Sequence, residues 1–279
     1  MNILIRRTGA LGDVILTTPI VRWFGYHNPQ SEILVQTAYP LVFRDYKNQR
    51  SFHNVRTIGP GEEMSRFGAP YVNLDLAYEK RPSMHVLYAY AEEAGIPAEN
   101  VPEMRLELFF DRRKMFDTSN RFVAVHAAYA GWKNRTLPRE MWKEVIDRLK
   151  LCNFKPILIG TERDDVPGAK CLRMFAPDIH AQARLIHSCA CFVGSDSAML
   201  HIAGATDTPI VGIFTSVLPE YRMPFRDVPQ IALTPDIGCI GCLERQPIPS
   251  TTETCERGDI ACVRVMRASD IITAVVSLV

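Results

Sequence analysis

The sequence predicts an α/β protein built from two units, each with a parallel, doubly wound sheet. Short apolar runs with the length of buried strands alternate with amphipathic helical segments in both halves of the chain, as parallel sheets require. A stretch at 96–120 interrupts this alternation with prolines and a charged run, which is typical of a connection between domains. At 279 residues the chain is long enough for two cores. We therefore predict domains at 1–118 and 119–279.

The composition is that of a soluble globular protein, with 47% hydrophobic and 23% charged residues and a net charge of +1. This net charge gives no electrostatic basis for non-specific binding to nucleic acids or membrane surfaces. No apolar run approaches the length of a membrane span. Because a strand pattern begins directly after Met1, we expect no signal peptide and a cytoplasmic location.

The first half begins with a strand at 2–7, a turn at 8–13 and a helix from Val14 to about Phe24. Gly12 permits a close backbone approach in the turn. Asp13 is expected either to cap the helix or to act as a general base where strand and helix meet. The pattern further predicts strands at 32–37, 55–58 and 71–77, and helices at 40–47 and 82–94.

The second half restarts the alternation with a strand at 121–126. The loop that follows carries Lys133 and Arg135, and a later strand at 156–160 runs into the acidic residues Glu162 and Asp164. Helices are expected at 138–151, 181–188 and 268–279. The final helix is apolar on one face and is a candidate to cross back to the N-terminal domain.

The segment 191–214 holds the strongest candidate site. It predicts a strand at 191–193, a tight turn at 194–197, a helix at 197–205 and a strand at 209–214. The polar turn can cap the helix, and unpaired N–H groups at its start can bind an anion. Asp196 and His201 are five residues apart, so we expect both near the mouth of one crevice.

Two motifs resemble the signatures of glycosyltransferase family 9, the lipopolysaccharide heptosyltransferase family. The segment from Gly194 to Ala205 resembles G-x-D-[ST]-G-x-x-H-x-A-A-A, with Ala198 in place of the family's usual glycine. The segment from Ile5 to Pro19 resembles S-x-G-D-[VI]-x-x-x-x-P, which puts Asp13 at the position of the family's catalytic base. The two motifs lie toward opposite ends of the chain in the family's order, so together they are more specific than either alone.

The resemblance implies a GT-B-type fold, in which an acceptor-binding and a donor-binding Rossmann-like domain face each other. It implies inverting, metal-independent transfer of a sugar from a nucleotide-diphosphate donor, an ADP-linked heptose, to a hydroxyl of a glycan or other acceptor. Arg135, with Lys133 as its rival, is implied at the diphosphate, and Glu162 or Asp164 at the ribose. The remaining donor-site positions implied are Gly12, Gly194, Ser195, Asp196, Ser197, Ala198 and His201.

Two functions from other classes fit the same residues. One is a nucleotide-sugar-binding protein without transfer activity, which has no use for a base at Asp13. The other is a two-domain sugar-nucleotide epimerase, which converts its nucleotide sugar with no acceptor present.

Four of the eight cysteines cluster in the loop 239–262; they are Cys239, Cys242, Cys255 and Cys262. A C-x2-C pair on one turn and two later cysteines can complete a tetrahedral metal site, and in a cytoplasmic protein metal is favoured over disulfides. Four sulfur ligands leave no open position, so zinc or iron here has a structural role; four thiols without metal are the alternative. Some members resembling this family, the heptosyltransferases that modify autotransporters, carry cysteine-bound iron in a comparable region.

Overall fold

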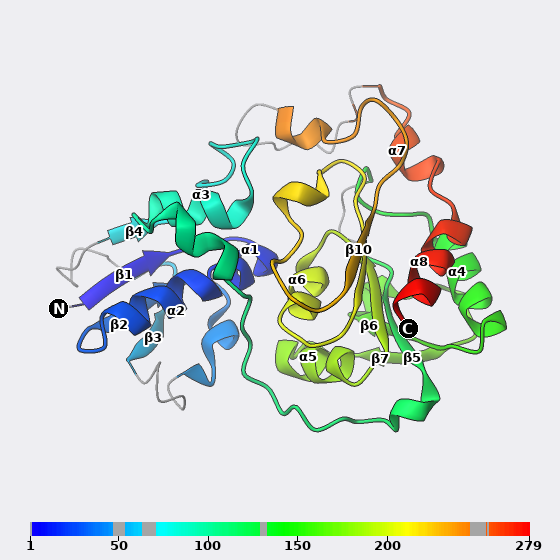
Figure 1. The fold of residues 1–279 in the computed structure, drawn as a ribbon, viewed down its shortest axis with the longest axis horizontal. Coiled ribbons are helices and arrows are strands. Elements are labelled where there is room, and N and C mark those ends of the chain that lie inside the picture. Colours follow the sequence, from blue (N-terminus) through cyan, green and yellow to red (C-terminus); the bar gives the residue numbers. More distant parts are fainter. Residues whose placement is uncertain (1, 47–53, 63–70, 129–132, 246–254, 256) are drawn as a thin grey trace. The chain divides into compact units, whose positions relative to one another are not determined.

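A computed structural model describes the chain apart from residues 1, 47–53, 63–70, 129–132, 246–254 and 256. The chain forms two compact units, 1–110 and 111–279 (Figure 1). Residues 98–110 belong to unit 1, because Val101, Leu106 and Leu108 are buried in it and the backbone N–H of Glu107 donates to the hydroxyl of Thr18.

Unit 1 is built on a four-stranded, fully parallel sheet with the order β3-β2-β1-β4. Its strands are β1 (Asn2–Arg6), β2 (Glu32–Gln36), β3 (Val55–Ile58) and β4 (Tyr71–Asn73). Its helices are α1 (Leu11–Leu16), α2 (Thr18–His27) and α3 (Val86–Glu93), with the 3-10 helices η1 (Pro40–Phe43) and η4 (Ala98–Glu103). The apolar centres of β1 and β2 are buried, as predicted from their sequence pattern.

Four details of unit 1 differ from the prediction. The helix predicted at 14–24 is two helices, which meet at Thr17, with Pro19 in the first turn of α2. Asp13 is therefore inside the first turn of α1 rather than at its cap, which is Ala10. The strand predicted to reach 77 ends at Asn73, and the chain turns through Leu76 at a φ of 60°. The helix predicted from 82 begins at Val86, where the ring of His85 accepts the N–H of Leu87.

Unit 2 is built on a six-stranded, fully parallel sheet with the order β10-β9-β8-β5-β6-β7. Its strands are β5 (Phe122–His126), β6 (Lys155–Gly160), β7 (Leu172–Phe175), β8 (Cys191–Ser195), β9 (Ile210–Ile213) and β10 (Gln230–Leu233). Its helices are α4 (Arg139–Leu151), α5 (Ile179–His187), α6 (Ala198–Gly204), α7 (Ala261–Arg264) and α8 (Ala268–Leu278), and its 3-10 helices are η5 (Thr118–Asn120), η6 (Glu162–Asp164), η7 (Pro219–Tyr221) and η8 (Cys242–Arg245). The edge strands β7 and β10 were not predicted; their side chains are mostly half-buried or exposed, so they lack the apolar run of a buried strand.

The last helix belongs to the core of unit 2. It packs against α4 and β10, and Ile271 and Val275 on its apolar face are fully buried (Figure 1). Within the described ranges, no helix has the length and apolarity that crossing a bilayer requires.

Both sheets confirm the predicted doubly wound α/β class, and each has one place where the winding direction reverses. In unit 1 this switch point lies between β1 and β4, and in unit 2 between β5 and β8. Open α/β sheets bind ligands beyond the carboxyl ends of the strands at such points. The candidate ligand-binding side chains are therefore those that follow β1 and β4 in unit 1, and those at the ends of β5 and β8 in unit 2.

Candidate active site

In unit 1, Asp13 is held at the switch point by a buried arginine. The guanidinium of Arg7, which directly follows β1 and is 4% exposed, donates to Oδ2 of Asp13 at 2.5 Å. The hydroxyl of Tyr78, from the turn after β4, lies 3.3 Å from Oδ1 of the same carboxylate. Asp13 keeps 17% of its side chain exposed, so a solvent-accessible carboxylate is oriented from two sides.

Arg7 is the centre of this cluster. It also donates to the carbonyl of Leu74 at 2.9 Å and lies 3.3 Å from a carboxylate oxygen of Glu79. Burial acts to lower the pKa of Arg7, but neighbouring side chains outweigh it and hold the pKa above its ordinary value; they are Tyr90, Asp13, Tyr78 and Glu79. Arg7 therefore stays charged and positions Asp13.

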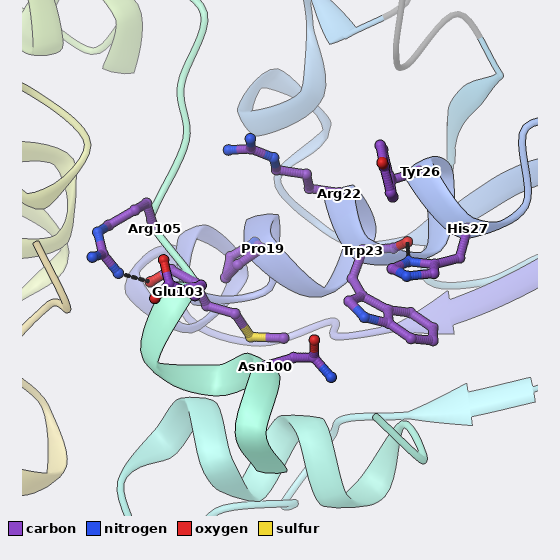
Figure 2. Close-up of a pocket in the computed structure, with 9 residues that line it drawn as sticks. Pro19, Arg22, Trp23, Tyr26, His27, Asn100, Glu103 and Arg105 are labelled. Atoms are coloured by element: carbon purple, nitrogen blue, oxygen red, sulfur yellow. Dashed lines mark hydrogen bonds between the residues drawn. The ribbon is translucent and has the colours of Figure 1, made fainter. Parts of the chain in front are cut away.

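A separate groove of about 260 Å³ opens between α2 and η4 of unit 1 (Figure 2). Trp23 and His27 stack along one wall with ring centroids 4.1 Å apart, beside the exposed Tyr26. None of the groove's lining residues belongs to the Arg7–Asp13 cluster. The groove and the predicted base are thus distinct features of unit 1.

In unit 2, Asp196 follows β8 and is the most strongly paired of the predicted donor-site residues. The guanidinium of Arg135 donates to its Oδ2 at 2.5 Å and to its backbone carbonyl at 3.2 Å. Nε2 of His201 lies 3.9 Å from Oδ1. The structure therefore brings together Asp196, His201 and Arg135. Lys133, the rival of Arg135, is exposed.

The electrostatics of this cluster include two residues that the sequence analysis did not single out. Burial acts to raise the pKa of Asp196, but Arg135, His201 and Arg222 outweigh it and hold the pKa below its ordinary value. Glu244, from η8, interacts electrostatically with Arg222 and Asp196. Its burial raises its pKa to about 7. Arg222 is near no recognisable motif, and the cysteine motif beside Glu244 does not link it to Asp196, so only the fold reveals the two.

Ser197 shows a contact that the sequence analysis missed. The residue is the N-cap of α6, yet it makes no side-chain cap bond within the described structure. Its hydroxyl instead lies 3.2 Å from Nδ1 of His126, the last residue of β5. Nε2 of His126 lies 3.6 Å from Oδ2 of Asp164. The signal available in the sequence was a polar residue at the carboxyl end of a buried strand.

The other predicted donor-site residues fall into four places. Gly194 and Ser195 end β8 as strand residues, whereas the prediction put them in the turn. Ala198 opens α6, and Gly12 lies in α1 of unit 1. Glu162 is exposed at the start of η6, while Asp164 at its end is buried and accepts the backbone N–H of Thr161 at 2.8 Å.

The four clustered cysteines, Cys239, Cys242, Cys255 and Cys262, lie near one another in unit 2. The eight cysteines, all of them described, form no disulfide. Burial together with the thiols of Cys242, Cys239 and Cys255 raises the pKa of Cys262 to about 11. Among the described residues no group of three or more histidine, cysteine or acidic side chains is arranged to hold a metal ion. The thiols thus share one electrostatic environment without converging on one point.

These features define a two-unit, GT-B-like α/β protein with a partly exposed carboxylate at one switch point and a buried charged cluster at the other. The family model for glycosyltransferase family 9 (heptosyltransferase) matches residues 58–253, which is more than half of the chain. The chain therefore belongs to this family of glycosyltransferases. The matched region contains the Asp196 cluster and lies after Asp13. No curated protein sequence matches the chain.

Several solved structures share the fold of this chain, although their amino-acid sequences have low identity to it. The iron-containing dodecameric glycosyltransferase TibC from enterotoxigenic E. coli H10407 is 14% identical, with a TM-score of 0.79 over 99% of this chain and 75% of TibC. A family 9 glycosyl transferase from Veillonella parvula DSM 2008 is 15% identical, with a TM-score of 0.71 over 99% of this chain and 96% of its own. The E. coli heptosyltransferase WaaC with ADP is 15% identical, with a TM-score of 0.62 and full coverage of both chains, 100% each.

Proposed function

We propose that the protein transfers a heptose-like sugar from an ADP-linked donor to an acceptor hydroxyl, with inversion at the anomeric carbon. The observation that carries this proposal is the pairing of Asp13 with Arg7 in unit 1 and of Asp196 with Arg135 in unit 2, each at the switch point of its sheet. Unit 1 binds the acceptor and unit 2 the donor. WaaC was solved with ADP, and a further structure of TibC holds ADP-D-β-D-heptose, which supports the choice of donor.

In this reaction Asp13 takes the proton of the acceptor hydroxyl while its oxygen attacks the anomeric carbon. The bond from that carbon to the diphosphate breaks, and its electron pair stays on the leaving phosphate oxygen. Arg135, whose side chain is 28% exposed beside Asp196, balances the charge that develops there. No step requires a metal ion.

The donor assignment is tested by calorimetric titration of the protein with ADP, UDP, GDP and CDP. We expect selective binding of ADP, with loss of binding in Asp196→Ala because this variant leaves Arg135 without its anchoring carboxylate. Asp165→Ala is the matched control, since its carboxylate pairs with Arg173 on another part of unit 2. Selective binding of another nucleotide would change the nucleobase of the proposed donor. Binding of none of the four nucleotides would overturn the proposed function.

We also propose that the four-cysteine loop binds one zinc or iron ion as a structural element. The mutual proximity of the four thiols around Cys262 supports this, although their described positions would have to converge by loop adjustment. Iron in the structurally similar TibC favours iron. Only the fold of the loop would depend on such an ion, because four thiolates leave no open coordination position.

Metal analysis of the purified protein tests this site. We expect about one equivalent of metal per chain, lost in Cys242→Ser, and a lower melting temperature for the metal-free protein because metal binding contributes folding free energy. Cys152→Ser, at the end of α4, should keep its metal. Wild-type protein that is purified without metal, and whose melting temperature does not rise when zinc or iron is added, would contradict the proposal.

A further inference from the structure

Three side chains from three segments of unit 2 form a continuous polar chain at the switch point. Asp164 of η6 faces Nε2 of His126 at 3.6 Å, and Nδ1 of His126 meets the hydroxyl of Ser197 at 3.2 Å. Asp164 is itself fixed, because its Oδ2 accepts both the backbone N–H and the hydroxyl of Thr161, at 2.8 and 2.9 Å. The imidazole of His126 is thus oriented from both of its nitrogens.

The backbone is shaped to admit this ring. Gly160, at the end of β6, has a φ of 109°, and a Cβ there would lie 2.6 Å from Oδ2 of Asp164 and 2.9 Å from the ring of His126. Gly160 on the strand that neighbours β5 therefore makes room for the ring of His126.

Fold stability alone does not account for the arrangement. His126 and Asp164 are 6% and 7% exposed, and burying an imidazole with a carboxylate costs desolvation that an apolar pair would avoid. Ser197 also forgoes the stabilising N-cap hydrogen bond that its hydroxyl could accept at the start of α6. The hydroxyl is turned toward His126 and into the predicted donor site instead.

We propose that His126 is a positioning residue of the donor site: held by Asp164, it donates from Nδ1 to the hydroxyl oxygen of Ser197, which leaves the proton of that hydroxyl for the terminal phosphate of the bound nucleoside diphosphate. A serine hydroxyl without such a partner samples several staggered rotamers, so preorganisation removes that loss of freedom from binding. This inference rests on the proposed function, since it requires a diphosphate at this site.

The same geometry distinguishes the two acidic residues of η6. Asp164 acts through His126 and not on the ribose, because its Oδ2 is already used by Thr161 and faces the ring. The exposed Glu162 is then the ribose contact. The two roles differ in a measurable way, since AMP and ADP share the ribose while only ADP has the terminal phosphate.

The test is calorimetric titration of wild type and variants with ADP and with AMP. We expect His126→Leu and Ser197→Ala each to weaken ADP binding about tenfold, the value of one hydrogen bond to a charged group, and to leave AMP binding unchanged. The double variant should be no weaker than either single variant, because both remove the same contact. His126→Asn, which keeps an amide nitrogen near the position of Nδ1, should restore most of the ADP affinity.

Asp164→Asn supplies a second test if His126→Leu does not fold. We expect it to weaken ADP and spare AMP, whereas Glu162→Gln should weaken both nucleotides. His187→Leu, which removes a buried histidine elsewhere in unit 2, is the control and should bind both as wild type does. Wild-type ADP affinity in His126→Leu, additive losses in the double variant, or equal losses of AMP and ADP in Asp164→Asn would overturn this inference alone. Absence of binding by the wild-type protein to any nucleoside diphosphate would overturn the proposed function and this inference with it.

Discussion

Asp13→Asn is expected to reduce sugar transfer by a factor of about 10² to 10⁴, the usual contribution of a positioned general base. The amide occupies the same volume and can keep contacts to Arg7 and Tyr78, but it cannot accept a proton from the acceptor. Donor binding should be unchanged, because the proposed donor contacts are centred on Asp196 and Arg135 in unit 2. The measurement is release of ADP from ADP-D-β-D-heptose, with water and then with simple methyl glycosides as acceptors.

Glu79→Gln is the matched control for this variant. It also removes one negative charge from the surroundings of Arg7, at a carboxylate 3.3 Å from the guanidinium, but leaves Asp13 intact. We expect it to retain most of the transfer activity. Equal losses in the two variants would show that Asp13 acts by balancing Arg7 and not as a base.

The same assay separates the alternative functions. A wild-type protein that binds the donor without releasing ADP would be a nucleotide-sugar-binding protein. One that alters the sugar while it remains attached to ADP, with no acceptor present, would be an epimerase. Either result would overturn the proposed transfer reaction.

Arg135→Met is the second variant with a large expected effect. It should lower the rate of ADP release by a factor of about 10² to 10³, the usual effect of removing one group that stabilises transition-state charge. It should also lower the free energy of unfolding by about 3 kcal/mol, because it leaves the buried carboxylate of Asp196 without its closest partner. Transfer kinetics and urea unfolding at neutral pH measure the two effects.

Lys133→Met distinguishes the two basic residues of this loop. Lys133 is exposed, so its replacement should change the free energy of unfolding by less than about 0.5 kcal/mol and leave the rate near that of wild type. Adding Asp196→Asn to Arg135→Met should recover stability but not activity, because the buried charge is then removed. A large loss of activity in Lys133→Met with a normal rate in Arg135→Met would reverse the assignment.

The sequence predicts well those features that depend on neighbouring residues. The buried strands β2, β5, β6 and β9 and the helix α4 agree with their predicted positions, since each is a run of apolar residues at the right period. Predicted boundaries are wrong where a single residue intervenes, as at Thr17 between α1 and α2 and at Leu76 after β4. The edge strands β7 and β10 lack such a run, because their side chains are mostly half-buried or exposed.

By itself the sequence determined the α/β class, the family resemblance and most of the candidate site, because motifs such as Gly194 to Ala205 keep their residues adjacent in the chain. Only the tertiary structure decided the order of the strands, and with it which distant side chains meet. Arg135 is 61 residues from Asp196, and His126 is 71 from Ser197. These pairs form because parallel strands align their carboxyl ends at the switch point, a relation that no local pattern records.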